Sequence, residues 1–347
     1  MRISSNVFFV PASPFLIAWN YVRHEQFELG LEYQSRLALL ISDGSNFDHD
    51  NPIDRSLLEA EILTGEVAKD DWGWDVLSKI FHFGTKNIPY QNQPKSLQDW
   101  AVSYSAHCTE VLEKKAPEND SLPSDAVRVS LPLPQKKTIE MDLVSVLLNR
   151  KTCRVFQAKA VELAVLGQIL YYSLGYLQER KSDIDPAVPE NFQSRRSSPS
   201  GGGLNATEGY VYIRACEGLP TGFYRYDSEC HKLIFLAELQ AELGLLMAGQ
   251  HFINDLPFGI LLVSRFDKLW WKYEHSRAYR MALIEAGHIA QTIQLVSTAL
   301  GLKTWVTGAF NEAAIEKILA LRPSQGELVF FVGAGYSNGE AIPEVLK

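Results

Sequence analysis

The longest helical pattern of the chain, from His275 to Leu300, constrains what the other residues can fold into. Small or apolar residues recur there at offsets of three and four: Ala278, Met281, Ala282, Ile284, Ile289, Ile293, Val296 and Ala299. No proline interrupts the pattern, and Gly301 follows it, where a residue that tolerates positive φ often ends a helix. A helix of about 25 residues is roughly 38 Å long, which is enough to cross a domain. We therefore expect one central helix with the main domain built around it.

The other face of this helix is expected to be polar. It carries Arg277, Arg280, Glu285, His288 and Gln291, with Gly287 among them. Glycine would let another group approach the backbone closely. Lys272 and Tyr273 stand just before the helix, after two tryptophans, and form a candidate pair for proton transfer. Taken alone, these residues fit an ordinary core helix with a solvated polar face better than a functional site.

Composition narrows the class of protein. Of the 347 residues, 46% are hydrophobic and 21% are charged, as in a globular protein with a large core. The formal net charge of -8 argues against nonspecific binding to nucleic acid or anionic lipid. The four cysteines are scattered, without spacing that suits zinc, so we expect reduced thiols, a cytoplasmic location and no metal site. Pro11 and Pro14 break the apolar run from Val7 to Val22, which therefore predicts strand and turn, not a signal peptide.

Residues 1–113 are expected to form an accessory region. Helices are predicted for Tyr33–Ser42 and for Asp54–Thr64, with Asp54 as the N-cap of the second. This order suggests a winged-helix-like module that binds a peptide or a partner protein, although a helical extension packed on the main domain explains it as well. The proline-rich and charged segment 114–134 is the predicted linker, and residues 135–347 are the main domain.

The main domain is predicted to mix α-helices and β-strands. Besides the long helix, the predicted helices are residues 139–148, 161–177, 238–247 and 311–319. The predicted strands are residues 211–214, 222–227, 232–236, 258–266, 303–307 and 328–332.

Two segments of this domain are suited to binding a ligand. Arg150, Thr152 and Arg154 lie close together after the first helix, and guanidinium groups bind phosphate in a bidentate manner. The second segment, Pro199-Ser200-Gly201-Gly202, exposes backbone amides on which a flat ligand could lie. Neither the Rossmann nor the P-loop glycine pattern is present.

These segments resemble a known family. NRKTCRVF is similar to the R-x-[ST]-x-[RK]-x-F phosphate signature of FMN-dependent nitroreductase-fold enzymes. PSGGGLNATEGYVYIR, EGLPTGFYRYD, the stretch WKYEHSRAYRMALIEAGHIAQTIQLVSTALGL and the following GAF resemble one branch of that fold. This branch is the azoline dehydrogenases of the streptolysin-S and microcin type. The resemblance covers residues 139 to 335 with the segments in the expected order; Asn205-Ala206-Thr207-Glu208 departs from the His/Tyr-Pro-x-Glu often found there.

The resemblance implies an α+β fold. Its central sheet is mainly antiparallel and flanked by helices, and its long helix lies at the interface of a homodimer. FMN is the implied cofactor, with its phosphate on the basic segment and its ring or ribityl chain on the glycine segment. The implied FMN-binding residues are Arg150, Thr152, Arg154, Pro199, Ser200, Gly201, Gly202, Asn205, Arg280, Glu285, Gly287, His288, Gln291 and Gly308.

Lys272 and Tyr273 match the lysine–tyrosine dyad of this branch. Oxidising an azoline to an azole removes a hydride and a proton from adjacent carbons, so a base must accompany the flavin. A tyrosine, with an ordinary pKa of about 10, is a poor base at neutral pH unless a neighbouring cation favours its phenolate. Trp270 and Trp271 could exclude water and lower the pKa of the lysine. The sequence leaves open which of the two accepts the proton.

The resemblance therefore implies an azoline dehydrogenase that matures a ribosomally made antibiotic peptide. It would act with a cyclodehydratase that forms the azoline rings of the precursor peptide. Three alternatives stay open: an oxidase of carrier-bound nonribosomal peptides, a general NAD(P)H-dependent nitro or quinone reductase, and a scaffold that mainly holds a complex together.

Overall fold

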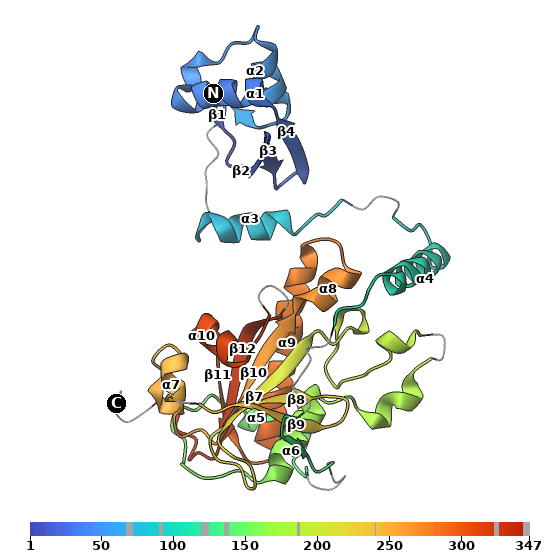
Figure 1. Ribbon diagram of the computed structural model, residues 1–347, viewed down its shortest axis with the longest axis vertical. Coiled ribbons are helices and arrows are strands. Elements are labelled where there is room, and N and C mark those ends of the chain that lie inside the picture. The colour runs from blue at the N-terminus through green and yellow to red at the C-terminus, as the bar shows by residue number, and fades with distance from the viewer. Residues whose placement is uncertain are drawn as a thin grey trace. The chain divides into compact units, whose positions relative to one another are not determined.

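The computed structural model describes residues 1–66, 72–89, 93–118, 125–134, 139–185, 188–239, 241–322 and 326–342. The chain divides into two compact units (Figure 1). The N-terminal unit comprises Met1–Ser103 with His275–Arg277, and the main unit comprises Tyr104–Glu274 with Ala278–Lys347. Part of the predicted linker, residues 119–124, lies outside the described residues.

The N-terminal unit combines small antiparallel sheets with helices, which confirms the predicted strand and turn within Val7–Val22 and the predicted helix near residues 33–42. A three-stranded sheet has the order β2 (Val7–Ala12), β3 (Phe15–Asn20) and β4 (Glu25–Leu29). A second ladder pairs β1 (Arg2–Ile3) with β5 (Leu63–Thr64). The helices are α1 (Leu31–Ser42), η1 (Gly44–Asn46), α2 (Pro52–Glu59) and α3 (Val76–Gly84).

The predicted N-cap role of Asp54 is wrong. Asn51 caps α2 instead, and its Oδ1 accepts a hydrogen bond from Ile53 N at 2.9 Å, because Pro52 already occupies the first helical turn. Asp54 is buried inside the helix and binds the Arg36 guanidinium through both oxygens, each at 2.6 Å. The helix ends at Glu59 and not at Thr64, since Leu63 and Thr64 pair with β1.

The main unit contains a seven-stranded sheet in the order β11-β12-β10-β7-β8-β9-β6, in which every pair of neighbours is antiparallel. This confirms the expected mainly antiparallel sheet. Its strands are β6 (Arg128–Ser130), β7 (Thr207–Ile213), β8 (Gly222–Asp227), β9 (Lys232–Ala237), β10 (Phe258–Arg265), β11 (Lys303–Thr307) and β12 (Gly326–Gly335). The edge strand β6 falls within the predicted linker, which is therefore partly built into the sheet.

Helices cover both faces of this sheet (Figure 1). They are α5 (Leu143–Asn149), α6 (Leu163–Leu174), α7 (Leu243–Leu246), α8 (Phe266–Lys272), α9 (Arg277–Ala299) and α10 (Glu312–Ile318), and the chain leading into the unit carries α4 (Leu97–Glu113). Short 3-10 turns are η2 (Gln178–Asp183), η3 (Glu190–Phe192), η4 (Gly201–Gly203) and η5 (His251–Ile253). The predicted helix 238–247 is reduced to α7, and α8 was not predicted.

Two apolar cores of the unit lie on opposite faces of the sheet. Phe258, Ile260 and Leu262 of β10 join the cluster that contains residues of α6 and α9. Leu261 and Val263 join the cluster that contains residues of α7 and α10. This alternation follows from the period of two along a strand, and explains why β10 is apolar along almost its whole length. In the described part of the chain, no helix combines the length and the apolar character needed to cross a membrane.

Candidate active site

The buried face of α9 matches the prediction at Ala278, Ala282, Ile289 and Ile293 and differs from it at three positions. Glu285, predicted on the polar face, is buried: its Oε2 accepts from Ser200 Oγ at 2.7 Å and its Oε1 accepts from Thr207 N at 2.8 Å. Met281 and Ile284, predicted in the core, are 39% and 46% exposed. The alanines take the buried positions because their small side chains allow close packing, while Glu285 is tolerated there because both of its oxygens are hydrogen-bonded.

The glycine segment lies along α9. Ser198 Oγ and Thr292 Oγ1 are 2.8 Å apart, and Ser200 binds Glu285 two helical turns earlier, so the segment runs antiparallel to the helix. The turn that follows requires positive φ at Gly202, where φ is 63°. Hydrogen bonds of two serine side chains therefore hold this segment against α9. Its glycines have no side chains that could cover the backbone.

Asn205 closes this loop. Its backbone N donates to Ser200 Oγ at 2.8 Å, and its side-chain amide donates to Ser194 O at 3.1 Å. The residue is buried, with a φ of 46°, a conformation that asparagine tolerates better than most residues. In this structure Asn205 holds the shape of the glycine loop, and its predicted contact with a cofactor stays a prediction.

The Lys272–Tyr273 pair packs against the same loop. The side chain of Lys272, at the end of α8, is fully buried at 0% exposure. Its Nζ donates to Gly202 O at 3.1 Å and to Tyr104 Oη at 3.3 Å, and lies 3.9 Å from the centre of the Phe192 ring. A Cβ atom added to Gly202 would collide with the Tyr273 hydroxyl. The structure therefore brings the predicted dyad and the predicted glycine loop into contact.

Burial changes the acid–base chemistry of both members of the dyad. It lowers the pKa of Lys272 below the ordinary 10.5, and the neighbouring thiol of Cys108 only partly opposes this. Burial raises the pKa of Tyr273, and Cys108 raises it further. Lysine is shifted toward its neutral form and tyrosine is kept protonated.

The groups that enclose Lys272 are not the predicted ones. Trp270 is 53% exposed, and Trp271 is half-buried and packs against Phe192, with 6.0 Å between the ring centres. Phe192 and Tyr104 surround the amine instead. No local pattern marks Phe192 in the sequence. Tyr104 and Cys108 are four residues apart on α4, and this spacing in the sequence indicates that they share one face of a helix.

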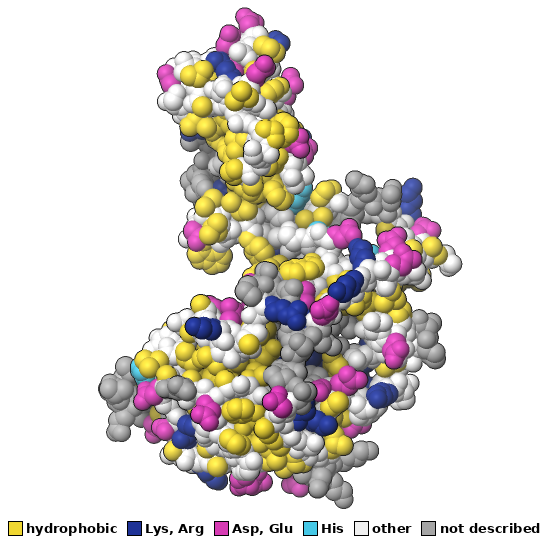
Figure 2. Space-filling view, in the orientation of Figure 1, with side chains coloured by type: hydrophobic (Ala, Val, Ile, Leu, Met, Phe, Trp, Pro, Cys, Tyr) yellow, Lys and Arg dark blue, Asp and Glu magenta, His cyan; other side chains and the backbone are white. Residues whose placement is uncertain are grey.

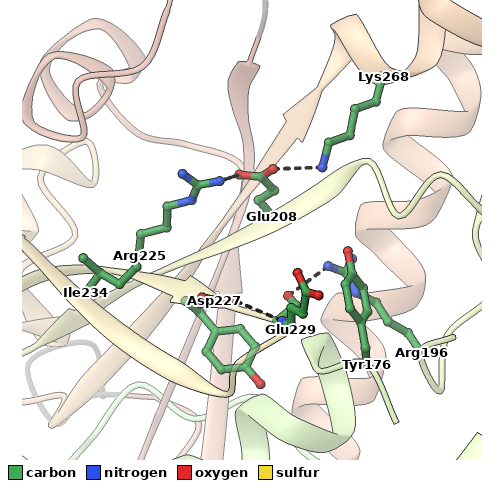
Figure 3. Close-up of a pocket in the computed structure, with 10 residues that line it drawn as sticks. Tyr176, Arg196, Glu208, Arg225, Asp227, Glu229, Ile234 and Lys268 are labelled. Carbon is green, nitrogen blue, oxygen red and sulfur yellow. Dashed lines mark hydrogen bonds and ion pairs between the residues drawn. The ribbon is translucent and has the colours of Figure 1, made fainter. Parts of the chain in front are cut away.

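An ion cluster around Glu208 anchors α8 (Figure 3). Glu208 of β7 binds Lys268 of α8 at 3.0 Å, Arg225 of β8 at 3.1 Å and Arg265 of β10 at 3.4 Å. Burial alone would raise the pKa of Glu208, but the three cations lower it to about 2. Lys268 lies one helical turn before Lys272, so this cluster fixes the helix that ends in the dyad.

Beside the cluster lies a pocket of about 240 Å³ (Figure 3). Its lining residues are Tyr176, Arg196, Glu208, Arg225, Tyr226, Asp227, Ser228, Glu229, Ile234 and Lys268. Cations and carboxylates are mixed in this lining, so the pocket presents no single sign of charge to a ligand.

The predicted phosphate-binding residues lie near the later half of α9. Arg150 follows α5, and Arg154 Nη1 donates to Ala341 O at 3.1 Å. Thr152 forms a β-bridge with Thr304 of β11. Contacts continue from Thr304 Oγ1 to Gln294 Oε1 at 3.5 Å, and from Gln294 Nε2 to Gln291 Oε1 at 3.3 Å. Among the described residues, no contact joins the basic segment directly to the glycine loop. Helix α9 connects the two.

The other predicted cofactor residues lie at accessible positions. Gly287, His288 and Gln291 are exposed on α9, and a Cβ added to Gly287 would meet no atom within 4 Å. Arg280 is half-buried near the start of α9, and Gly308 is exposed after β11. Among the residues that the structure describes, no group of three or more His, Cys, Asp or Glu side chains is placed to hold a metal ion.

Comparison with known proteins agrees with the fold that the sequence motifs predict. The sequence profile of the nitroreductase family matches residues 147–336. MJ1384 of Methanocaldococcus jannaschii, whose name describes a nitroreductase, is 29% identical over 185 residues, which are 53% of this chain and 86% of that protein. The trifolitoxin operon protein TfxC of Rhizobium leguminosarum bv. trifolii is 25% identical over 275 residues, 76% of this chain and 72% of that protein.

Two further similarities are informative. The microcin B17-processing protein McbC of Escherichia coli is 29% identical over 141 residues, which are 38% of this chain and 51% of McbC. The crystal structure of a protein of Ralstonia eutropha JMP134, titled a nitroreductase, superimposes with a TM-score of 0.51 at 21% identity, covering 65% of this chain and 97% of that one. The latter supports the fold alone.

Proposed function

Because this chain belongs to the nitroreductase family, we propose that it is an FMN-dependent dehydrogenase that oxidises azoline rings in a ribosomally made peptide to thiazoles or oxazoles. The family makes the chain an oxidoreductase. Its similarity to the microcin B17-processing protein McbC and to TfxC of the trifolitoxin operon supports a role in peptide maturation. The resemblance of the dyad and glycine segments to azoline dehydrogenases supports the choice of reaction.

The residues present fit FMN chemically. Arg150 and Arg154 supply guanidinium groups and Thr152 supplies a hydroxyl, a donor set suited to the phosphate. The backbone of Gly201, where an added Cβ would lie 3.9 Å from its nearest neighbour, and the open space at Gly287 suit the flat ring and its chain. When bound, FMN would supply the hydride acceptor for the oxidation.

The buried Lys272 carries the proposal. Among the described residues no carboxylate is paired with its amine, while a carbonyl, a phenol and an aromatic ring surround it. Burying an ammonium group without an opposite charge is unfavourable, so the neutral amine is favoured. A neutral Lys272 can accept the proton released from the azoline ring. Tyr273, kept protonated, then acts as a hydrogen-bond donor toward the substrate.

The proposed partners are a second copy of the chain, cyclodehydratase subunits and the precursor peptide, in the cytoplasm. Exposed apolar side chains of α9, such as Met281, Leu283 and Ile284, suit a helix that packs against its own copy. In the N-terminal unit, apolar side chains gather on the part that includes the three-stranded sheet (Figure 2), with Val10 and Phe15 exposed. We assign this unit to contact with the peptide or with partner subunits.

The test is mass spectrometry of an azoline-containing peptide incubated with the FMN-loaded protein. The wild-type protein should lower the mass by about 2 Da per ring, since a hydride and a proton leave. Lys272→Ala and Tyr273→Phe should bind FMN and leave the azoline unchanged. Full conversion by both variants would remove the dyad from the mechanism. NAD(P)H-dependent reduction of nitro or quinone compounds, without azoline oxidation, would favour the general reductase.

A further inference from the structure

The second half of α4 belongs to the main unit. Residues from Tyr104 onward group with it, although they precede both the region matched by the nitroreductase family and the predicted domain start at residue 135. Cys108 and Val111 are buried in a cluster with Phe266 and Leu269 at the start and middle of α8 and with Ala278 and Ala282 of α9. Helix α4 therefore packs directly against the helix that presents the dyad.

Two polar side chains of α4 reach Lys272. Tyr104 Oη accepts a hydrogen bond from Lys272 Nζ at 3.3 Å. The Cys108 thiol, buried in the same cluster, lies close enough to Lys272 and to Tyr104 to raise the pKa of both. The two residues are four positions apart and so share one face of the helix. Together with Gly202 O, they give the lysine amine three polar contacts that carry no formal negative charge while thiol and phenol are protonated.

We propose that Tyr104 and Cys108 are positioning residues of the dehydrogenase, which hold the Lys272 amine in a fixed place against the glycine loop. The inference rests on the proposed function and adds to it a part of the chain outside the family-matched region. The active site is then incomplete without the second half of α4.

The uncharged nature of these partners has a physical consequence. A lysine side chain has four rotatable bonds, so its amine needs several contacts to be held in one orientation. A carboxylate would provide such contacts but would also favour the ammonium, which cannot accept a proton. A phenol, a thiol and a backbone carbonyl orient the amine with a weaker effect of this kind, since Cys108 only partly opposes the lowering of the Lys272 pKa by burial. The titratable groups that face it are Tyr104, Cys108 and Tyr273, and Phe192 closes the remaining side.

Tyr104 is expected to stay a neutral phenol while Lys272 acts. Burial, together with the adjacent thiol of Cys108, raises the pKa of Tyr104 to about 12. Its hydroxyl can therefore donate or accept a hydrogen bond throughout the range in which the enzyme would turn over.

Steady-state kinetics of the FMN-loaded full-length protein test the proposal. Tyr104→Phe and Cys108→Ala should each lower kcat roughly tenfold or more, with KM for the azoline peptide unchanged, because a misplaced base slows only the chemical step. Cys108→Ser keeps a small hydrogen-bonding side chain and should recover most of the rate. Wild-type kcat in both Tyr104→Phe and Cys108→Ala would overturn the proposal.

Val111→Ala is the matched control for packing. It removes buried apolar atoms from the same helix without touching Lys272, so it should lower thermal stability and leave kcat near that of the wild type. An equal loss of kcat in Val111→Ala and Cys108→Ala would mean that α4 acts through packing alone and would contradict the positioning role. Glu110→Gln, an exposed change on α4, should affect neither property.

A second measurement needs no substrate. The Cε resonance of Lys272, assigned by its loss in Lys272→Arg, reports the protonation of the amine by NMR. Because the Cys108 thiol favours the ammonium, Cys108→Ala should move the titration midpoint of Lys272 to lower pH, and Val111→Ala should not move it. If the wild-type protein oxidises no azoline while this shift is observed, the proposed function fails and the contact with α4 stands. An unchanged midpoint in Cys108→Ala would overturn the contact itself.

Discussion

At the scale of single residues, the site depends on the partners of its buried ionisable side chains. Glu285 is buried with both oxygens hydrogen-bonded, whereas Lys272 is buried among uncharged groups. The first arrangement holds the glycine loop against α9, and the second favours the neutral amine that the proposed reaction needs. Tyr273 lies beside that amine with its own pKa raised, so the two members of the dyad are suited to different roles.

The dyad should give a characteristic pH dependence. The pKa of Lys272 is lowered, so kcat should rise with pH as the ammonium loses its proton and should level off above that pKa. The folded state disfavours the ammonium, so this lysine destabilises the fold below its folded pKa, and the penalty disappears as pH rises toward the unfolded value. Initial rates across the pH range check this. A rising limb at the same pH in Lys272→Ala would assign it to another group.

The basic segment should control FMN affinity. Arg150→Ala and Arg154→Ala each remove charge-assisted hydrogen bonds worth about 1.5–3 kcal/mol, so affinity should fall roughly tenfold or more per substitution. Flavin fluorescence titration measures the loss. Lys151→Ala, a change at an exposed position of the same segment, is the control and should bind FMN normally. A wild-type protein that takes up no added FMN would contradict the cofactor assignment.

At the scale of elements, α8 and α9 have different structural roles. Helix α9 is the support on which the glycine loop and the basic segment are both placed. Helix α8 is only seven residues long, and it is held from outside by the Glu208 cluster and by packing with α4. A short helix fixed at several points can present two side chains at its end with little freedom.

The Glu208 cluster should contribute strongly to stability. Glu208→Gln leaves Lys268, Arg225 and Arg265 without their shared carboxylate, and removing one partner of a buried ion pair costs about 3–5 kcal/mol. Since the pKa of Glu208 is lowered from 4.5 to about 2, its contribution is complete above the unfolded pKa and is lost as pH falls through that interval. Urea unfolding at neutral and acidic pH is the measurement. Glu229→Gln, an exposed change at the same pocket, should unfold like the wild type.

At the scale of the whole molecule, the division into two units matters for function. The sequence predicts an accessory region that ends at residue 113, whereas the main unit begins at Tyr104. A cut at 113 would remove Tyr104 and Cys108 from Lys272. The division of labour between accessory region and dehydrogenase domain stays a prediction, and its boundary for experiments should lie before α4.

Removing residues 1–92 keeps α4 whole and tests the role of the N-terminal unit. The shortened protein should bind FMN normally but act more slowly on full-length peptide or assemble less with cyclodehydratase subunits. Removal of residues 1–113 should in addition abolish azoline oxidation, because part of the Lys272 site is lost. Normal processing of full-length peptide by the first truncation would refute a contact role for this unit. Flavin titration and peptide mass spectrometry on both proteins distinguish the outcomes.

Local patterns in the sequence were sufficient for much of the fold. The period of three and four residues located α9, and apolar runs between turn residues located β10 and β11. The resemblance of the motifs, in their order along the chain, to nitroreductase-fold enzymes also indicated the family. These features depend on neighbours within a few residues, so they can be read along the chain.

Only the tertiary structure decided that Glu285 joins the buried face of α9 and what surrounds Lys272. The alanine spacing of α9 permits more than one rotation, and the choice depends on the hydrogen bonds of Glu285 to Ser200 and Thr207. Tyr104 meets Lys272 across 168 residues of sequence. A contact of that kind follows from how α4 packs on α8, and packing depends on the shapes of both surfaces at once, which no periodicity within one segment encodes.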